Sequence, residues 1–247
     1  MTAPALVALA HGSRDPRSAR TVRALVSEVR AMRPDLRIET AFLDLSKPDF
    51  HTVVDKLARS GVEEIVVVPL LLTEAFHARV DVPSAVGEAL ARHEGLKIRV
   101  SQVLGLGQVF LDVLDRRVRE SLVGARVREL DGLVLAAAGT TDPLALQSIQ
   151  RLARLWGQRH KLPVVPAYAS ASPPATGEAV RALRAQGRRH IAVGSLFLAP
   201  GLLYDRAAEL ALEAGAVAVA EPFGADPDVA RVVLARYLVG AVELVPV

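Results

Sequence analysis

The sequence of 247 residues contains no cysteine. This absence excludes disulfides, cysteine-ligated zinc, iron–sulfur clusters and a thiol nucleophile. Long apolar runs are missing as well, because the longest ones, 5–10 and 133–138, fall far short of the roughly 18 residues that cross a bilayer. No cation precedes the first run, as a signal peptide would require. We therefore expect a soluble, cytoplasmic protein that has no membrane partner.

Aromatic residues make up only 4% of the chain, and there are 4 lysines against 26 arginines. The arginines are spread over predicted helices, whereas proteins that bind nucleic acids usually cluster basic residues among aromatic ones. We therefore do not expect nucleic acid as a partner. The formal net charge is only +3, but arginine suits carboxylate and phosphate groups, so an anionic small molecule stays open as a ligand.

Short apolar runs alternate with amphipathic segments along the whole chain, a pattern typical of an α/β protein with parallel sheets. In the first half the predicted strands are 5–10, 38–43, 64–71 and 97–103, and the predicted helices are about 17–32, 49–60, 83–93 and 108–123. In the second half the predicted strands lie near 133–138, 164–169, 191–198 and 216–220, with helices between them and a last helix at about 227–238.

The two halves of the chain also resemble each other in their letters. The matching segments are VALAHGSRDP (7–16) with VLAAAGTTDP (134–143), and VVVPLLL (66–72) with IAVGSLF (191–197). We therefore predict two similar domains, 1–124 and 125–247, each a parallel sheet flanked by helices. Internal duplication would relate them as a pseudo-twofold pair.

Three polar side chains follow the first three predicted strands, where open parallel sheets bind their ligands. His11, Asp44 and His77 are separated by 33 residues at each step. Neighbouring parallel strands lie about 4.8 Å apart, so these three groups can converge on one ion. Two imidazoles and a carboxylate suit Fe²⁺, Co²⁺, Ni²⁺ or Zn²⁺ and leave coordination positions open.

Spacing alone does not separate this metal site from histidines that merely cap a loop or face the solvent. We assign such a capping or solvent-facing role to the histidines on predicted helices or at strand starts, which are His51, His93, His160 and His190.

The repeat adds a comparison within the chain. Ala138, about Ala169 and about Leu202 stand opposite His11, Asp44 and His77, whereas Gly139, Asp142 and Pro143 match Gly12, Asp15 and Pro16. Side chains needed only for folding would be expected in both halves, so we predict one metal site, in the first domain.

Three segments of the first half carry a resemblance to a known family. HGSRDP (11–16), FLDLSKP (42–48) and VVVPLLLTEAFHARVDVP (66–83) resemble the three motif blocks of sirohydrochlorin chelatases, which are class II tetrapyrrole chelatases. The resemblance covers about residues 5–115, and the weaker second half is similar to the long two-domain form. It implies an enzyme that inserts Co²⁺ or Fe²⁺, with Ni²⁺ as a third candidate, into sirohydrochlorin during siroheme or cobalamin biosynthesis.

The family's residues carry over by position. Its two metal-binding histidines fall on His11 and His77, and its acidic residue, usually Glu, falls on Asp44. Any of these three could accept the pyrrole protons, and activity should fall below about pH 6 because histidine titrates near pH 6.5. The residues that we assign to binding the macrocycle and its carboxylates are Ser13, Arg14, Phe76 and Arg79, with Phe76 standing where the family usually has Gly. The resemblance implies the metal as substrate, no organic cofactor and no iron–sulfur cluster, and the duplication leads us to expect a monomer.

Two other functions stay open at this point. A carrier of metal or tetrapyrrole could use the same groups without turnover. A porphyrin ferrochelatase is a weaker alternative, because its less anionic macrocycle would favour more aromatic and methionine side chains than the 4% aromatics and 2 methionines found here.

Overall fold

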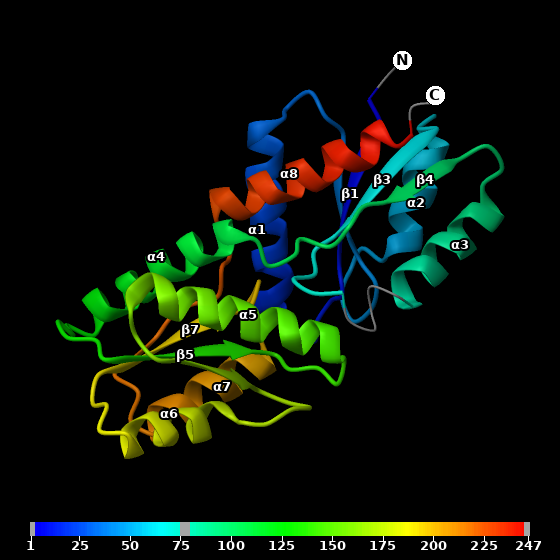
Figure 1. Cartoon of the computed structure of the whole chain (residues 1–247). Helices are drawn as coiled ribbons and strands as arrows, with labels where there is room; N and C mark the ends of the chain where they lie inside the picture. Colours follow the sequence, from blue (N-terminus) through cyan, green and yellow to red (C-terminus); the bar gives the residue numbers. More distant parts are fainter. Residues whose placement is uncertain (1–2, 75–79, 245–247) are drawn as a thin grey trace. The chain divides into compact units, whose positions relative to one another are not determined.

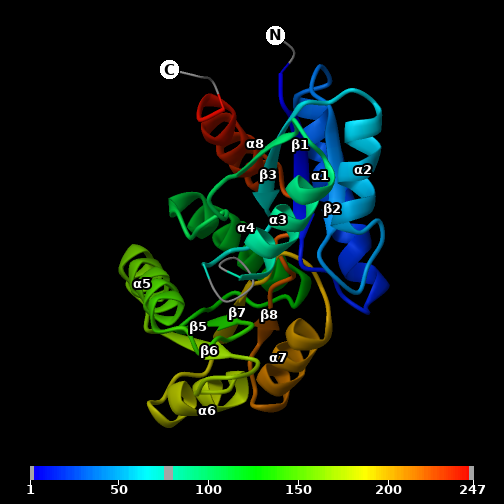
Figure 2. The same cartoon turned by 90° about the vertical axis from the view of Figure 1, so that its right-hand side faces the viewer.

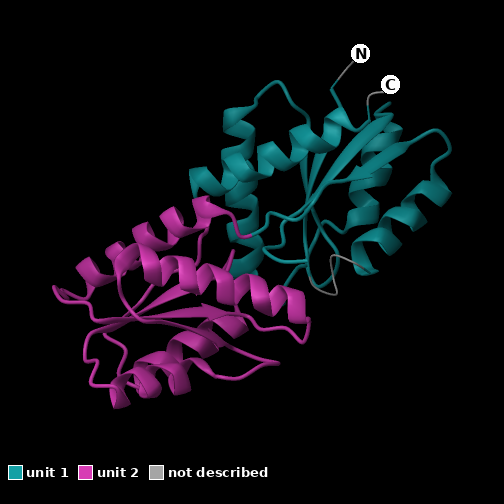
Figure 3. Cartoon of the chain, viewed as in Figure 1, with its two compact units in different colours: residues 1–105, 225–247 teal, residues 106–224 magenta. Residues whose placement is uncertain are grey.

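The computed structural model describes residues 3–74 and 80–244 (Figures 1 and 2). The chain forms two compact units, each with its own core (Figure 3). Unit 1 consists of Met1–Gly105 and Ala225–Val247, and unit 2 consists of Leu106–Gly224. None of the helices in 3–74 and 80–244 combines the length and apolar character needed to cross a membrane.

Unit 1 contains one parallel sheet with the strand order β2-β1-β3-β4. Its strands are β1 (Ala5–Ala10), β2 (Ile38–Phe42), β3 (Glu64–Pro69) and β4 (Lys97–Val100), and its helices are α1 (Pro16–Met32), α2 (Phe50–Arg59), α3 (Val82–Arg92) and α8 (Pro227–Val242). Every residue of β1 is buried, which is typical of a central parallel strand covered by helices on both faces.

Unit 2 repeats this topology with the strand order β6-β5-β7-β8. Its strands are β5 (Gly132–Ala137), β6 (Val164–Tyr168), β7 (Ile191–Leu196) and β8 (Ala218–Val219), and its helices are α4 (Gln108–Gly124), α5 (Pro143–His160), α6 (Thr176–Ala185) and α7 (Leu202–Glu213). The predicted α/β class and the predicted pair of similar sheets are thus confirmed. Strands β4 and β8 are shorter than predicted.

Local sequence explains where the helices begin. Asp15 caps α1 by accepting the backbone N–H of Arg17 at 2.8 Å, and Pro16 occupies the first helical position. Asp142 and Pro143 begin α5 in the same way. The apolar residues of α2, such as Val54 and Leu57, are buried against the sheet of unit 1.

The boundary between the units differs from the predicted division at 124/125. Helix α4 follows the last strand of unit 1 but packs on β7 and β8 of unit 2, and α8 follows the last strand of unit 2 but packs on α1 and β3 of unit 1. A close approach supports the second contact, since an added Cβ on Gly240 would lie 2.7 Å from Val66. The two units therefore exchange the helix that follows their fourth strand.

Candidate functional site

The strand order places the candidate site at the carboxyl ends of the central strands of unit 1. The chain runs from β1 to β2 on one side of the sheet and from β3 to β4 on the other, so the strand order reverses between β1 and β3, and open parallel sheets bind ligands at such switch points. His11 follows β1 directly and Asp44 lies just beyond β2. The backbone N–H of Asp44 donates to the carbonyl of His11 at 2.9 Å. The structure thus brings these two predicted residues to adjacent strand ends.

Gly12 lets the two loops approach so closely. Its φ is +101°, and a Cβ at this position would lie 1.7 Å from the carbonyl oxygen of Asp44. An L side chain fits neither the dihedral angle nor the space. The glycine that follows His11 is therefore required by the contact between the two loops.

Ser46 holds the same two loops together through its hydroxyl group. Its Oγ accepts the backbone N–H of Ser13 at 3.1 Å and donates to the carbonyl of Ser13 at 3.0 Å. Sequence reasoning did not single out Ser46. The signal that could have identified it is the serine at the corresponding place in the second half, Ser172, whose Oγ donates to the carbonyl of Thr140 at 2.5 Å.

The two predicted ligands differ in their surroundings. His11 is half-buried and its Nδ1 atom is buried, whereas Asp44 is exposed. The Oδ1 atom of Asp44 accepts the backbone N–H of Leu45 at 2.7 Å. Among the described residues, no hydrogen-bond donor contacts its Oδ2 atom. Of the predicted substrate-binding residues on the first loop, Ser13 is half-buried and Arg14 is exposed. An imidazole and an accessible carboxylate at adjacent strand ends are groups that can bind a cation or accept a proton.

The remaining predicted residues, His77, Phe76 and Arg79, lie outside the described residues. The predicted convergence of three ligands stays a prediction for that reason. Within 3–74 and 80–244, no group of three or more His, Asp or Glu side chains is placed to hold a metal ion.

Neighbouring carboxylates serve the helices instead. The guanidinium of Arg17, which bonds to Asp15, lowers the pKa of that carboxyl group. The ammonium of Lys47, together with the backbone N–H of Thr52, holds the pKa of Asp49 well below its usual value. Both side chains are thus ionised at neutral pH and stabilise the first turns of α1 and α2.

Unit 2 has the same loop geometry without the ionisable side chains. Gly139 has a φ of +95°, an added Cβ would lie 1.9 Å from the carbonyl oxygen of Ser170, and the N–H of Ser170 donates to Ala138 at 3.0 Å. The residue opposite Asp44 is therefore Ser170, one position beyond the predicted Ala169. Ala138 stands opposite His11, as predicted from the sequence.

The other histidines of the chain each contact a carboxylate. The pairs are His51 with Glu88 at 3.2 Å, His93 with Asp55 at 2.7 Å, His160 with Asp115 at 2.7 Å and His190 with Glu129 at 3.5 Å. These contacts agree with the structural role that the sequence predicts for them.

Comparison with known proteins defines the class to which this fold and site belong. The sequence model of the CbiX family matches residues 5–121 and again residues 132–238. The two matches together span most of the chain, so the protein belongs to the CbiX family and contains the family's unit twice. The predicted duplication and the predicted family are confirmed.

Two similar proteins come from Priestia megaterium. The chain is 25% identical over 203 residues to a sirohydrochlorin cobaltochelatase, in an alignment that covers 81% of this chain and 66% of the relative. It is 23% identical over 206 residues to a sirohydrochlorin ferrochelatase, with coverages of 83% and 77%. The chain thus spans slightly less than two thirds of the first relative.

Two solved structures share the fold over nearly their whole length. SirB from Bacillus subtilis with Fe³⁺ has a TM-score of 0.81 at 22% identity, covering 97% of this chain and 96% of SirB. The sirohydrochlorin chelatase SirB from Bacillus subtilis subspecies spizizenii in complex with cobalt also has a TM-score of 0.81, at 20% identity, with coverages of 98% and 97%.

Proposed function

We propose that this protein inserts a divalent metal, Co²⁺ or Fe²⁺, into sirohydrochlorin. One observation carries the proposal: unit 1 places an imidazole and a carboxylate at adjacent strand ends, and unit 2 presents Ala138 and Ser170 in the same backbone frame. Folding alone does not account for this difference. The names of the relatives indicate the same chemistry for both metals.

In this proposal the metal is a substrate that passes from the protein to the macrocycle. His11 presents Nε2 to the ion, because Nδ1 is buried. Asp44 supplies an oxygen ligand, and His77 supplies the third group. Neutral imidazoles and a carboxylate bind a divalent ion while leaving positions at which the pyrrole nitrogens can replace water.

Insertion also requires that two protons leave the pyrrole nitrogens as the metal binds the four nitrogens of the ring. The imidazole of His11 and the carboxylate of Asp44 are the described groups that can accept these protons. Ser13 and Arg14 lie on the loop that contains His11 and would bind the carboxylates of the macrocycle, Ser13 through its hydroxyl group and Arg14 through its guanidinium group. Phe76 and Arg79 are assigned to the same substrate.

The test compares His11→Ala and Asp44→Ala with the matched variant Ser170→Ala in unit 2. Metal insertion is followed by the absorbance change of sirohydrochlorin with Co²⁺ or Fe²⁺, with protein-free samples as the baseline. We expect His11→Ala to lose at least about a hundredfold in rate, as expected for loss of a group that acts in proton transfer or metal binding. Ser170→Ala should retain the parental rate.

Two outcomes would contradict the proposal. If the parental protein binds sirohydrochlorin and metal but does not raise the insertion rate above the protein-free baseline, it is a carrier. If His11→Ala and Asp44→Ala both keep the parental rate while remaining folded, the assignment of the site to the first unit is wrong.

A further inference from the structure

Leu45 combines two features that are unfavourable in a folded chain. It has a φ of +58°, in the left-handed region that favours glycine and asparagine, and the residue is 47% exposed. A bulky apolar residue at such an angle is strained. Violations of local rules of this kind concentrate at functional sites.

The position of Leu45 connects it with the candidate site. It follows Asp44 directly, and its backbone N–H donates to the Asp44 Oδ1 atom at 2.7 Å. The backbone N–H of Leu45 thus helps to orient the carboxylate. Glycine or asparagine would provide the same N–H with less strain, so the backbone does not explain why the side chain is leucine.

Comparison with unit 2 separates the effect of the Leu45 side chain from that of the loop backbone. Ala171 occupies the corresponding place, with a φ of +63°, directly after Ser170. Among the described residues, the other non-glycine residues with positive φ are Arg126 and Lys161, which lie at the ends of α4 and α5, where this conformation is common. The loop conformation is thus shared by both units, but only unit 1 adds a large exposed apolar group beside a candidate ligand.

We propose that the Leu45 side chain packs against the apolar face of the tetrapyrrole, an inference that rests on the proposed function. A metal held by Asp44 must enter the centre of the ring, so the residue next to Asp44 faces the ring and not its acidic rim. An exposed leucine gains nothing from a metal ion or a small anion. It does gain by covering the apolar face of a planar macrocycle, because both surfaces then leave water.

The experiment measures the affinity for metal-free sirohydrochlorin by absorbance and fluorescence titration. We expect Leu45→Ala to raise the Kd about tenfold, because a few buried methyl and methylene groups are lost. Leu45→Met should restore an affinity close to that of the parental protein. Binding of Co²⁺ alone should be unchanged in both variants, because the N–H donor to Asp44 is retained.

A third variant separates binding from folding. Leu45→Asn relieves the backbone strain, so its melting temperature should stay the same or rise, while its Kd for sirohydrochlorin rises. Ala171→Asn makes the same change in unit 2 and should leave the Kd unchanged. A role in folding alone would instead lower the melting temperature of the Leu45 variants.

The proposal is overturned if Leu45→Ala and Leu45→Asn bind metal-free sirohydrochlorin as tightly as the parental protein does. Because this titration needs no turnover, it is independent of the insertion rate. A parental protein that binds sirohydrochlorin without inserting metal contradicts the proposed function but leaves the effect of Leu45 measurable. A parental protein that does not bind sirohydrochlorin overturns both proposals.

Discussion

At the scale of single residues, Gly12 sets how closely the loop after β1 approaches the loop after β2. The carbonyl oxygen of Asp44 occupies the space that a side chain at Gly12 would need. His11 directly precedes Gly12 and Asp44 is the residue that Gly12 contacts, so the positions of both candidate ligands depend on a glycine that has no reactive side chain.

We therefore expect Gly12→Ala to destabilise unit 1 by about 2–4 kcal/mol and to abolish metal insertion, since the added Cβ forces the loops apart. Gly139→Ala provides the matched control, because the corresponding contact in unit 2 is with Ser170. It should destabilise unit 2 by a similar amount and keep insertion at temperatures where it is folded. Urea unfolding and insertion assays measure the two effects, and an active Gly12→Ala protein would contradict the argument.

Individual residues also show how far the sequence predicts the site. His11 and Asp44 can be placed at strand ends because buried strands have a clear apolar signal. The hydroxyl of Ser46 bridges two loops that are 33 residues apart, and no periodic pattern marks such a contact. The correspondence of Asp44 with Ser170 depends on the exact end of β6, which apolar runs define only to within a residue or two.

At the scale of elements, α2 and α3 are linked by charged side chains above the sheet of unit 1. The Nε2 atom of His93 lies 2.7 Å from the Oδ1 atom of Asp55, and the Arg92 guanidinium lies 3.9 Å from Oδ2. The hydrogen bond from His93 is the main cause that lowers the pKa of Asp55, and the charge of Arg92 adds to it. Helix α3 follows the segment that contains His77, so this link anchors the helix beyond the predicted ligand.

A carboxyl group whose pKa is lowered by folding stabilises the protein above its unfolded pKa of about 3.9, and this stabilisation is lost as the pH falls through the folded value. We expect Asp55→Asn to lower the free energy of unfolding at pH 6 by up to about 1 kcal/mol, because the pair is partly exposed. The difference should shrink as the pH is lowered from about 4 towards 2. Urea unfolding at several pH values measures it, and a double-mutant cycle with His93→Gln isolates the pair. A difference that grows on acidification would exclude this origin.

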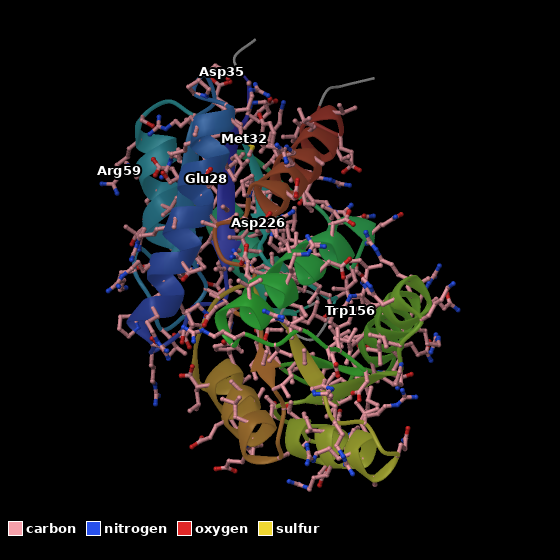
Figure 4. The ribbon with its side chains drawn as sticks, turned by 90° about the vertical axis from the view of Figure 1, so that its left-hand side faces the viewer. Glu28, Met32, Asp35, Arg59, Trp156 and Asp226 are labelled. Atoms are coloured by element: carbon pink, nitrogen blue, oxygen red, sulfur yellow. The ribbon has the colours of Figure 1, made fainter. Side chains whose placement is uncertain are left out.

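The elements themselves were largely predictable, but their partners were not. The apolar periodicity of α4 and α8 identifies both helices and leaves open which sheet they cover, because periodicity describes a helix face and not what lies against it. The expected division at 124/125 assigns each helix to the strand before it. The contacts place α4 in unit 2, where the Nε1 atom of Trp156 on α5, labelled in Figure 4, donates to Asp115 on α4 at 2.7 Å.

At the scale of the whole molecule, the exchange makes one unit continuous in sequence and the other discontinuous. Unit 2 is formed by 106–224 alone, whereas unit 1 needs residues from both sides of it. Helix α8 covers β3 and also contacts the segment just before β1, because the Tyr237 hydroxyl donates to the carbonyl of Pro4 at 2.7 Å. Unit 1 without α8 would expose this side of its sheet.

We therefore expect a fragment of residues 106–224 to fold alone, with a cooperative thermal transition, and a fragment of residues 1–124 to aggregate or to remain partly unfolded. Trp156, the single tryptophan of the chain, is 1% exposed and reports on unit 2 through its fluorescence. A blue-shifted emission that is lost in one step on heating would support the expectation. If 1–124 melts cooperatively and 106–224 does not, the division into units is wrong.

The returning helix also fixes an order of events during synthesis on the ribosome. The segment that contains His11 and Asp44 is translated first, yet its sheet obtains its final cover only after all of the intervening unit has emerged. At translation rates of about 5–20 residues per second, several seconds pass between the synthesis of the first sheet and the synthesis of α8, which covers it. Unit 2 can therefore reach its native state before the unit that precedes it, and the half of the protein that carries the candidate ligands is the last to be completed.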